Sequence, residues 1–417
     1  MAPRLSMGDF AAKRFEANQL FTPSTPITVA ELFAGRQDQA FRIVDGIGER
    51  GRHIILFGER GVGKTSLVQI IPYLLPAPKP QTVKFARVQC FPTDGYSSIC
   101  KKIFKEIRFT ADIGEGPKTY DVSEMYPGEV SPDDFVREMS VFSENDIPVI
   151  VIDEFNELLD DGAPTLLANT IKALSDAGTN VTLIIVGVAD NVTDLISSHA
   201  SIERCTAEIL MPRMSTDELR EIIEKRLKQL GMTIEPDAKW KIINLAKGLP
   251  QYVHGLGKLS CFWAIAERRL HMTEHDTNRA IVNLLDTSEQ TFKTAYETAT
   301  RSNQPDNLFK HVLTACALAK ADENGYFAPV AVREPLAGIL GRGVTIATFQ
   351  NHLADFAEKR GQILQRIGEQ RSHRLRFRHP AMQPYVIMRG IQEGIVDERA
   401  KQALSSPQQG DLFPNAT

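Results

Sequence analysis

The stretch that most constrains the fold of this chain lies between Arg52 and Gln69 and reads RHIILFGERGVGKTSLVQ. Its apolar run Ile54–Phe57 has the length and β-branching of a buried strand. The run ends at Gly58, opens the pattern G-x-x-x-x-G-K-T and is followed by an apolar-periodic helix. A strand, a glycine loop and a helix start form the context in which this pattern binds phosphate. The sequence therefore predicts a phosphate-binding loop, in preference to a chance match.

The residue types in the loop each have a physical use. Glycines let backbone N–H groups curl around phosphate oxygens, and the helix start adds unpaired donors and the positive end of its dipole. We expect Lys64 to reach the β- and γ-phosphates and the Thr65 hydroxyl to ligate Mg²⁺. The predicted phosphate-binding residues are Gly58, Glu59, Arg60, Gly61, Val62, Gly63, Lys64, Thr65 and Ser66.

A second buried strand is predicted at Pro148–Phe155, which reads PVIVIDEF. Its acids stand only at the C-terminal end, where open α/β sheets place their ligand chemistry. Asp153 is expected to hold Mg²⁺, directly or through water, and Glu154 to orient the water that attacks the γ-phosphate. The alternative is an ordinary strand ending in two solvated acids. The spacing of about 90 residues from the phosphate loop favours the catalytic interpretation.

Together these motifs resemble the Walker A and Walker B motifs of the AAA+/STAND branch of phosphate-loop ATPases, of the bacterial origin-initiator-like (ORC/Cdc-like) type. The resemblance implies a three-layer α/β fold with a parallel sheet of strand order 5-1-4-3-2, a helical lid and a C-terminal winged helix. It also implies ATP and Mg²⁺ as ligands, ATP hydrolysis that is slow without partners, and a homo-oligomer.

The expected division of the chain follows the same resemblance. It consists of an extended or partly disordered N-terminal extension (1–28), a nucleotide-binding core (29–213), a lid (214–273), one long linker helix (274–303), a winged-helix domain (304–400) and a disordered tail (401–417). Within the core, residues 110–130 lack periodicity and are expected to form an exposed loop.

Further site residues are implied by the resemblance alone. Asp190 follows the apolar run Val181–Ala189 where the family commonly has a sensor-1 Asn, and Asn191 comes one residue later. The alternative is that both end the strand and cap the next helix. Arg204 resembles the arginine finger that completes a neighbouring subunit's site, with Arg213 as the second candidate. The alternative for Arg204 is a surface ion pair with Glu203 or Glu208.

Two more segments resemble nucleotide-contacting parts of the family. In GLPQYVHGLG, Gln251 stands where a sensor-2 arginine is usual, with Pro250 before it and His254 one turn on. A packed helix histidine is the alternative for His254. The missing arginine predicts a switch first and a fast hydrolase second. The segment Val29–Arg36 resembles one that packs beside the nucleotide base, with a capped surface helix as the alternative.

Near the C-terminus, arginines alternate with apolar residues in Arg374–Arg378. A period of two puts Leu375 and Phe377 on the core face and the guanidinium groups on the other. Contact with the phosphate backbone of duplex DNA is the predicted use, and a solvated or protein-binding face is the alternative. The predicted DNA-binding residues are Arg371, Arg374, Arg376 and Arg378.

Bulk properties limit the remaining choices. A length of 417 residues predicts two or three domains, and a net charge of -4 excludes a globally basic nucleic-acid binder. We expect a cytoplasmic protein with no membrane span or secretion signal, and five scattered cysteines without C-x-x-C pairing predict reduced, mostly buried thiols. The leading interpretation is an ATP-driven switch that couples nucleotide state to oligomerisation and DNA binding. The alternative is a STAND-like signalling or scaffold NTPase, a phage-defence or transposition helper, whose winged helix binds protein.

Overall fold

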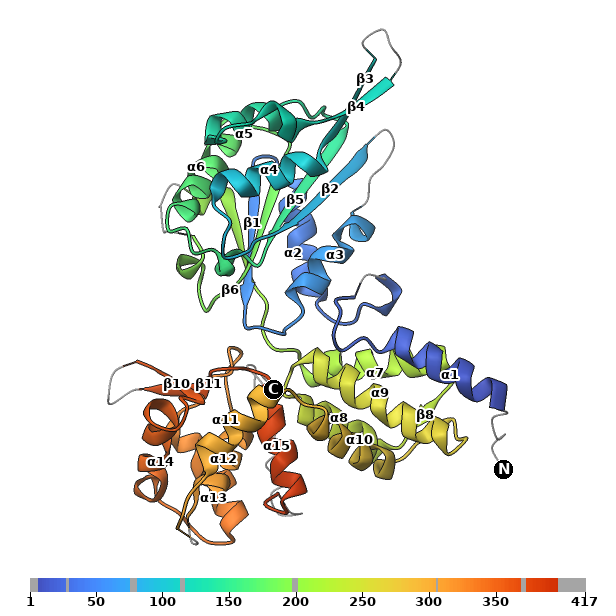
Figure 1. Ribbon diagram of the computed structural model, residues 1–417, viewed down its shortest axis with the longest axis vertical. Coiled ribbons are helices and arrows are strands. Elements are labelled where there is room, and N and C mark those ends of the chain that lie inside the picture. The colour runs from blue at the N-terminus through green and yellow to red at the C-terminus, as the bar shows by residue number, and fades with distance from the viewer. Residues whose placement is uncertain are drawn as a thin grey trace, which may run out of the picture. The chain divides into compact units, whose positions relative to one another are not determined.

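The computed structural model describes residues 7–27, 30–75, 81–112, 117–196, 202–304, 307–368 and 373–396 (Figure 1). The chain divides into two compact units. The core unit comprises residues 26–59 and 63–211, and the helical unit comprises residues 1–25, 60–62 and 212–417. The expected tail at 401–417 lies outside the described residues.

The core unit contains a parallel sheet of five strands in the order β2-β5-β6-β1-β7. Counted along the chain and read from the other edge, this is the predicted order 5-1-4-3-2. The strands are β1 (His53–Gly58), β2 (Thr82–Gln89), β5 (Asp146–Asp153), β6 (Thr182–Val188) and β7 (Thr206–Leu210). Strand β6 pairs with both β1 and β5, so the two motif-bearing strands flank it.

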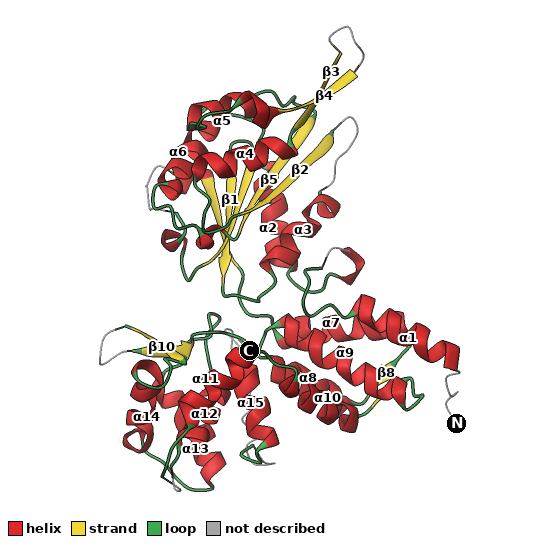
Figure 2. Ribbon diagram, viewed as in Figure 1, coloured by secondary structure: helices red, strands yellow, loops and turns green. Residues whose placement is uncertain are grey.

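Helices cover both faces of this sheet, as Figure 2 shows. On one face Ile55, Ile152 and Ile185 belong to an apolar cluster with α4, α5 and α6. On the other face α2 packs so closely that a Cβ at Gly46 would lie 3.2 Å from the Ile54 side chain. Burial on both sides explains why the central strands are continuous apolar runs. These helices are α2 (Gln37–Gly48), α3 (Lys64–Leu74), α4 (Tyr96–Glu106), α5 (Pro132–Met139) and α6 (Ala163–Asp176).

The prediction of an exposed loop after α4 was wrong. Residues Arg108–Asp112 (β3) and Pro117–Asp121 (β4) form an antiparallel hairpin, and a short 3₁₀ helix, η2 (Val122–Met125), follows. Apolar alternation marks strands that bury one face, whereas backbone pairing alone can hold a hairpin that lacks the pattern.

The helical unit begins with a helix where an extended segment was expected. Helix α1 (Met7–Leu20) ends beside Phe21, which is fully buried. A Cβ at Gly257 would lie 2.6 Å from the Phe21 ring, so the glycine is what admits the ring. This packing partner lies more than 200 residues away, so the N-terminal sequence alone carries little sign of it.

The predicted lid helices are present. They are α7 (Thr216–Leu230), α8 (Pro236–Ala246) and α9 (Pro250–Ala266), with a short parallel pair of strands, β8 (Thr233–Ile234) and β9 (His271–Met272). The Ser215 hydroxyl accepts from the Glu218 backbone N–H, and Gly231 ends α7 with φ of 62°, as the predicted capping box and stop require.

The single linker helix predicted for 274–303 is instead two helices, α10 (Glu274–Asp286) and α11 (Gln290–Thr300). At the break the hydroxyls of Thr287 and Ser288 donate to the carbonyls of Asn283 and Leu284, respectively. Such side-chain bonds compete with the helix ladder and end α10.

The C-terminal part shows the predicted order of three helices and a hairpin. The helices are α12 (Phe309–Leu318), α13 (Arg333–Leu340) and α14 (Ile346–Glu358), with η6 (Pro329–Val332) before α13. The hairpin pairs β10 (Leu364–Ile367) with β11 (Arg374–Phe377), and a further helix, α15 (Met382–Gln392), was not predicted. Leu375 and Phe377 are buried and Arg374 is exposed, which confirms the predicted alternation.

Three simple properties of the described residues complete the fold. All five cysteines are buried and free, as predicted. Among the described helices, none combines the length and apolar character needed to cross a bilayer. The described part of the chain likewise contains no cluster of three or more His, Cys, Asp or Glu side chains suited to a metal ion.

Candidate nucleotide site

The loop between β1 and α3 has the backbone of a phosphate loop. Gly58, Gly61 and Gly63 have φ of 148°, 86° and 97°, a region that L side chains avoid. At Gly58 the constraint is also steric, because a Cβ there would lie 2.4 Å from the Met211 carbonyl oxygen. Strand β1 ends at Gly58 and α3 begins at Lys64, as the motif predicted.

Lys64 is buried within this loop. Its Nζ donates to the carbonyl oxygens of Gly58 and Glu59, both at 2.9 Å. The ammonium group is therefore held by the loop's own backbone at the N-terminal end of α3. A fixed positive charge among the loop's backbone groups meets the requirement of the predicted phosphate contact.

The two predicted acids lie at the C-terminal end of β5. Asp153 is almost fully buried, and its Oδ1 accepts from the Glu154 backbone N–H at 2.9 Å. Its Oδ2 accepts from Arg87 of β2, at 2.6 Å from Nη2 and 3.1 Å from Nε. Glu154 is the first residue beyond the strand and has φ of 55° and ψ of 39°. Such a left-handed conformation in a non-glycine residue costs about 1–3 kcal/mol and is often found at functional sites.

Asn156 is a neighbour of these acids that belongs to no sequence motif. Its Oδ1 accepts from the Val188 backbone N–H at 2.6 Å, at the end of β6. A Cβ at the preceding Gly187 would lie 2.4 Å from Leu195, so the chain is tightly packed there. This hydrogen bond of Asn156 thus connects the loop after β5 to the C-terminal end of β6.

The sensor-1 candidates follow β6 directly. Asn191 uses its side-chain oxygen to accept from the Asp194 backbone N–H at 3.1 Å and from the Thr193 hydroxyl, so it caps the 3₁₀ helix η4 (Val192–Asp194). For Asn191 this is the capping role that was given as the alternative to the sensor-1 role. Asp190 lies one residue closer to the strand, in the bend after it.

The two finger candidates differ in exposure. Arg204, in the 3₁₀ helix η5 (Glu203–Cys205) just before β7, keeps 67% of its side chain exposed. Its ion-pair partner is Asp176, the last residue of α6, at 2.5 Å. Arg213 instead donates to Gln383 and to the Lys247 carbonyl oxygen within the helical unit.

The segment expected beside the nucleotide base is described from residue 30 onward. It contains the 3₁₀ helix η1 (Ala30–Leu32), and Leu32, Ala34 and Arg36 are buried. Just ahead of it, the Ile27 backbone N–H donates to the Ser66 hydroxyl at 3.1 Å. Ile27, which precedes the segment, is therefore held at the first turn of α3 by the Ser66 hydroxyl.

The lid candidates lie at the start of α9. Pro250 is its first residue, and a Cβ at Gly61 would lie 3.6 Å from Nε2 of Gln251. His254 is buried, and its Nδ1 accepts from the Thr22 backbone N–H at 3.0 Å. Burial, with smaller contributions from the charges of Arg226 and Lys258, lowers the pKa of His254 to about 3. This geometry favours the alternative of a packed, neutral helix histidine.

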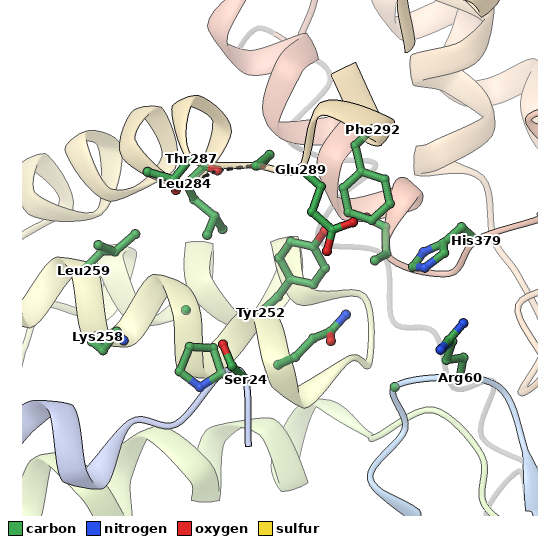
Figure 3. Close-up of a pocket in the computed structure, with 16 residues that line it drawn as sticks. Ser24, Arg60, Tyr252, Lys258, Leu259, Leu284, Thr287, Glu289, Phe292 and His379 are labelled. Atoms are coloured by element: carbon green, nitrogen blue, oxygen red, sulfur yellow. Dashed lines mark hydrogen bonds between the residues drawn. The ribbon is translucent and has the colours of Figure 1, made fainter. Parts of the chain in front are cut away.

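A cavity of about 690 Å³ in the helical unit includes the tip of the phosphate loop (Figure 3). Arg60 and Gly61 line it together with Gln251, Glu289 and His379. Figure 3 shows the Tyr252, Phe292 and His379 rings at one side of the cavity, with Arg60 below His379. The Tyr252 hydroxyl donates to the Ala381 carbonyl oxygen at 2.6 Å, and the Phe292 and His379 ring centroids are 5.0 Å apart. His379 and Phe292 were not among the predicted site residues, because neither belongs to a sequence motif.

Comparison with known proteins assigns the family. The family model for Novel STAND NTPase 1 (nSTAND1) matches residues 27–315, which is more than half of the chain. The chain belongs to the nSTAND1 family. The matched span contains both the phosphate loop and the acidic end of β5, in agreement with the resemblance noted in the sequence.

Solved structures agree on the fold of this nSTAND1 protein. The Aeropyrum pernix ORC2 protein, in ADPNP-ADP complexes, is 17% identical over 93% of this chain and 98% of its own, with a TM-score of 0.50. The Walker-type ATPase Paby2304 of Pyrococcus abyssi is 15% identical over 88% and 99%, with a TM-score of 0.51. At these identities the likeness concerns the fold alone. No curated protein matches the nSTAND1 chain.

The donor set of the nSTAND1 site suits Mg²⁺. The Thr65 hydroxyl and the Asp153 carboxylate are hard oxygen ligands, the type that Mg²⁺ prefers. Because Mg²⁺ keeps several waters and binds substrate phosphates beside one or two protein oxygens, phosphate oxygens and water would complete the coordination.

Proposed function

We propose that this nSTAND1 protein is a Mg²⁺-dependent molecular switch that binds and hydrolyses ATP and couples nucleotide state to oligomerisation. The observation that carries the proposal is the buried ammonium group of Lys64, held by the Gly58 and Glu59 carbonyl oxygens at the start of α3. In a family of nucleoside triphosphatases, a fixed cation in such a loop is best explained as a phosphate ligand.

Each residue of the site has a role in this proposal. The loop's backbone N–H groups and Lys64 bind the β- and γ-phosphates, and Thr65 and Asp153 hold Mg²⁺. The metal supplies charge neutralisation on the phosphate oxygens. Glu154 orients the attacking water and accepts its hydrogen bond. With these groups in place, the phosphates are positioned and shielded before the bond to the γ-phosphate breaks.

Two observations support a slow switch. Gln251 is neutral, so α9 offers no cation at the position where the family commonly has the sensor-2 arginine. Arg204 is exposed at the surface of the core unit, and a residue that serves a neighbouring subunit has to be accessible in this way.

The cavity in the helical unit brings the loop tip together with α9 and with His379, which follows the hairpin. Contacts of this kind would let the lid and the C-terminal helices respond to bound phosphate.

The proposal is tested by nucleotide binding and turnover. Wild type should bind a fluorescent ATP analogue in the presence of Mg²⁺ and release phosphate from ATP. Lys64→Ala should lose nucleotide binding, whereas Lys84→Ala, which removes an exposed lysine from β2, should retain it. Equal binding by Lys64→Ala and wild type would show that the loop is not the nucleotide site.

For the C-terminal part we propose a winged helix that contacts duplex DNA through the arginines of β11. The order of three helices and a hairpin supports the first half of this proposal. A specific observation favours the second candidate, a STAND-like scaffold whose winged helix binds protein. Arg374 pairs with Asp322 at 2.8 Å, and Arg376 and Arg378 donate to Gln365 and Gln362. These contacts engage the guanidinium groups within their own domain, and Arg371 lies outside the described residues.

A further inference from the structure

The proposed metal ligand Asp153 is already engaged by an arginine from the neighbouring strand. In the pairing of β2 with β5, Gln89 lies opposite Asp153 and Arg87 lies opposite Val151. Arg87 and Gln89 are two residues apart and share a face of the sheet, so the Arg87 side chain can reach along that face to Asp153. Its Nη2 and Nε both donate to Oδ2, at 2.6 and 3.1 Å.

The two side chains of this ion pair differ in their exposure to solvent. The Asp153 side chain is 2% exposed, whereas that of Arg87 is 26% exposed. A buried carboxylate needs a partner, because an unpaired charge away from water is strongly disfavoured. The second oxygen, Oδ1, is satisfied by the Glu154 backbone N–H. Both oxygens of the proposed metal ligand therefore have protein partners, and the partner of Oδ2 is a partly exposed cation.

We propose that Arg87 is a latch on the metal site: it holds Asp153 in the metal-free protein and competes with Mg²⁺ for Oδ2. This inference rests on the proposed function, since it assumes that Asp153 binds the metal. Arg87 is a positioning residue that acts through Asp153. Its partial exposure gives the guanidinium group a path to solvent when the metal takes over the carboxylate.

The physical basis is competition between two cations for one oxygen atom. A charge-assisted arginine–carboxylate bond is worth about 1.5–3 kcal/mol, so its loss opposes metal binding. Mg²⁺ also requires near-octahedral geometry at short distances, which a guanidinium group on the same oxygen disturbs. The latch therefore raises the Mg²⁺ concentration needed for nucleotide binding, and it keeps Asp153 paired when no nucleotide is present.

The test replaces Arg87 by Met, which removes the charge at similar length, and by Gln, which still donates to Asp153. Lys84→Met is the matched control, because it removes one positive charge from the same strand away from Asp153. For each variant, the affinity for a fluorescent ATP analogue is measured across a Mg²⁺ titration that begins in EDTA. Melting temperatures are measured with and without Mg²⁺ and nucleotide.

For Arg87→Met we expect half-saturation at about tenfold less Mg²⁺ than wild type, a lower melting temperature without metal, and a larger gain on adding Mg²⁺ and nucleotide. Arg87→Gln should show the same direction with a smaller shift, and it remains informative if Arg87→Met does not fold. Lys84→Met should match wild type. Unchanged or increased Mg²⁺ requirements in the Arg87 variants would overturn the latch while leaving the proposed function standing. If wild type itself binds no nucleotide, the proposed function fails first.

Discussion

The Thr22 backbone N–H donates a 3.0 Å hydrogen bond to Nδ1 of His254, which fixes the chain leaving α1 to the middle of the lid. A second bond nearby has the same effect, since Nε of the buried Arg226 donates to the Leu20 carbonyl oxygen at 3.0 Å. The Phe21 ring between these anchor points is fully buried and approaches His254 edge-on. Nδ1 accepts this hydrogen bond and therefore cannot carry a proton itself. His254 has to be neutral for this arrangement to exist.

Acid should therefore weaken the attachment of the N-terminal segment. Burial lowers the pKa of His254 from 6.5 to about 3 in the folded chain. A group with a lowered folded-state pKa contributes stability above pH 6.5 that is lost progressively as the pH falls toward 3. By pH 4 the loss is on the order of 3 kcal/mol from this residue. Urea unfolding of wild type and His254→Gln between pH 4 and pH 7 measures it, because glutamine accepts the same bond without titrating.

The pH profile of His254→Gln should be flatter than that of wild type, although not flat. His53 in the core unit accepts from the Leu183 backbone N–H at 3.1 Å, and burial lowers the pKa of its ring to about 4. It therefore adds acid sensitivity of the same sign. Parallel profiles for the two proteins would contradict the role given to His254.

Glu154→Gln should separate nucleotide binding from turnover. The amide keeps the size of the side chain and loses the charge that orients and accepts from the attacking water. We expect ATP binding close to that of wild type and single-turnover hydrolysis slower by about 100-fold or more. Glu157→Gln, three residues further on in the same loop, is the control. Unchanged hydrolysis in Glu154→Gln would remove the residue from its proposed role.

Much of the core followed from local patterns, because parallel strands buried on both faces are continuous apolar runs. The runs at β1, β5 and β6 predicted their strands, and the resemblance supplied their order. The N-terminal helix and the β3–β4 hairpin were missed for the opposite reason. Helix α1 is held by the Phe21 ring, which packs into the space at Gly257, and β3 is held by backbone pairing with β4. Neither interaction produces a periodic pattern of apolar residues in the sequence.

The residues of the candidate site likewise fall into those that could be predicted from local patterns and those that could not. Residues of the phosphate loop and the acidic strand end could be selected because the chemistry requires those types at that spacing. Arg87, Asn156 and His379 could not, since each acquires its contacts only when strands or helices distant in sequence come together. The ion pair of Arg204 shows the limit well: its partner Asp176 lies 28 residues away, whereas the alternative to the finger role named the nearby acids Glu203 and Glu208.

Arg204 should act only in an assembly, if it completes a neighbouring subunit's site. The turnover of wild type per chain should then rise with protein concentration, and Arg204→Ala should remove the rise. At the highest concentration we expect a reduction of about three orders of magnitude or more, the usual effect of a finger arginine. Arg137→Ala is the control, because Arg137 is another exposed arginine paired with a nearby aspartate. Turnover that is independent of concentration, and equal in the two variants, would contradict a role in trans.

The arginines of β11 give the last prediction, which decides between the two partners proposed for the C-terminal domain. Substituting Arg374, Arg376 and Arg378 together by Gln should weaken binding to duplex DNA at low salt and reduce the slope of log affinity against log salt by up to about 3. The matched control removes the same number of charges from α7, at Arg220, Lys225 and Lys228. Leu375 and Phe377 remain in place, so the hairpin core is preserved. If the β11 and α7 variants bind DNA equally, the arginines serve their contacts with Asp322, Gln365 and Gln362, and the protein-binding alternative gains support.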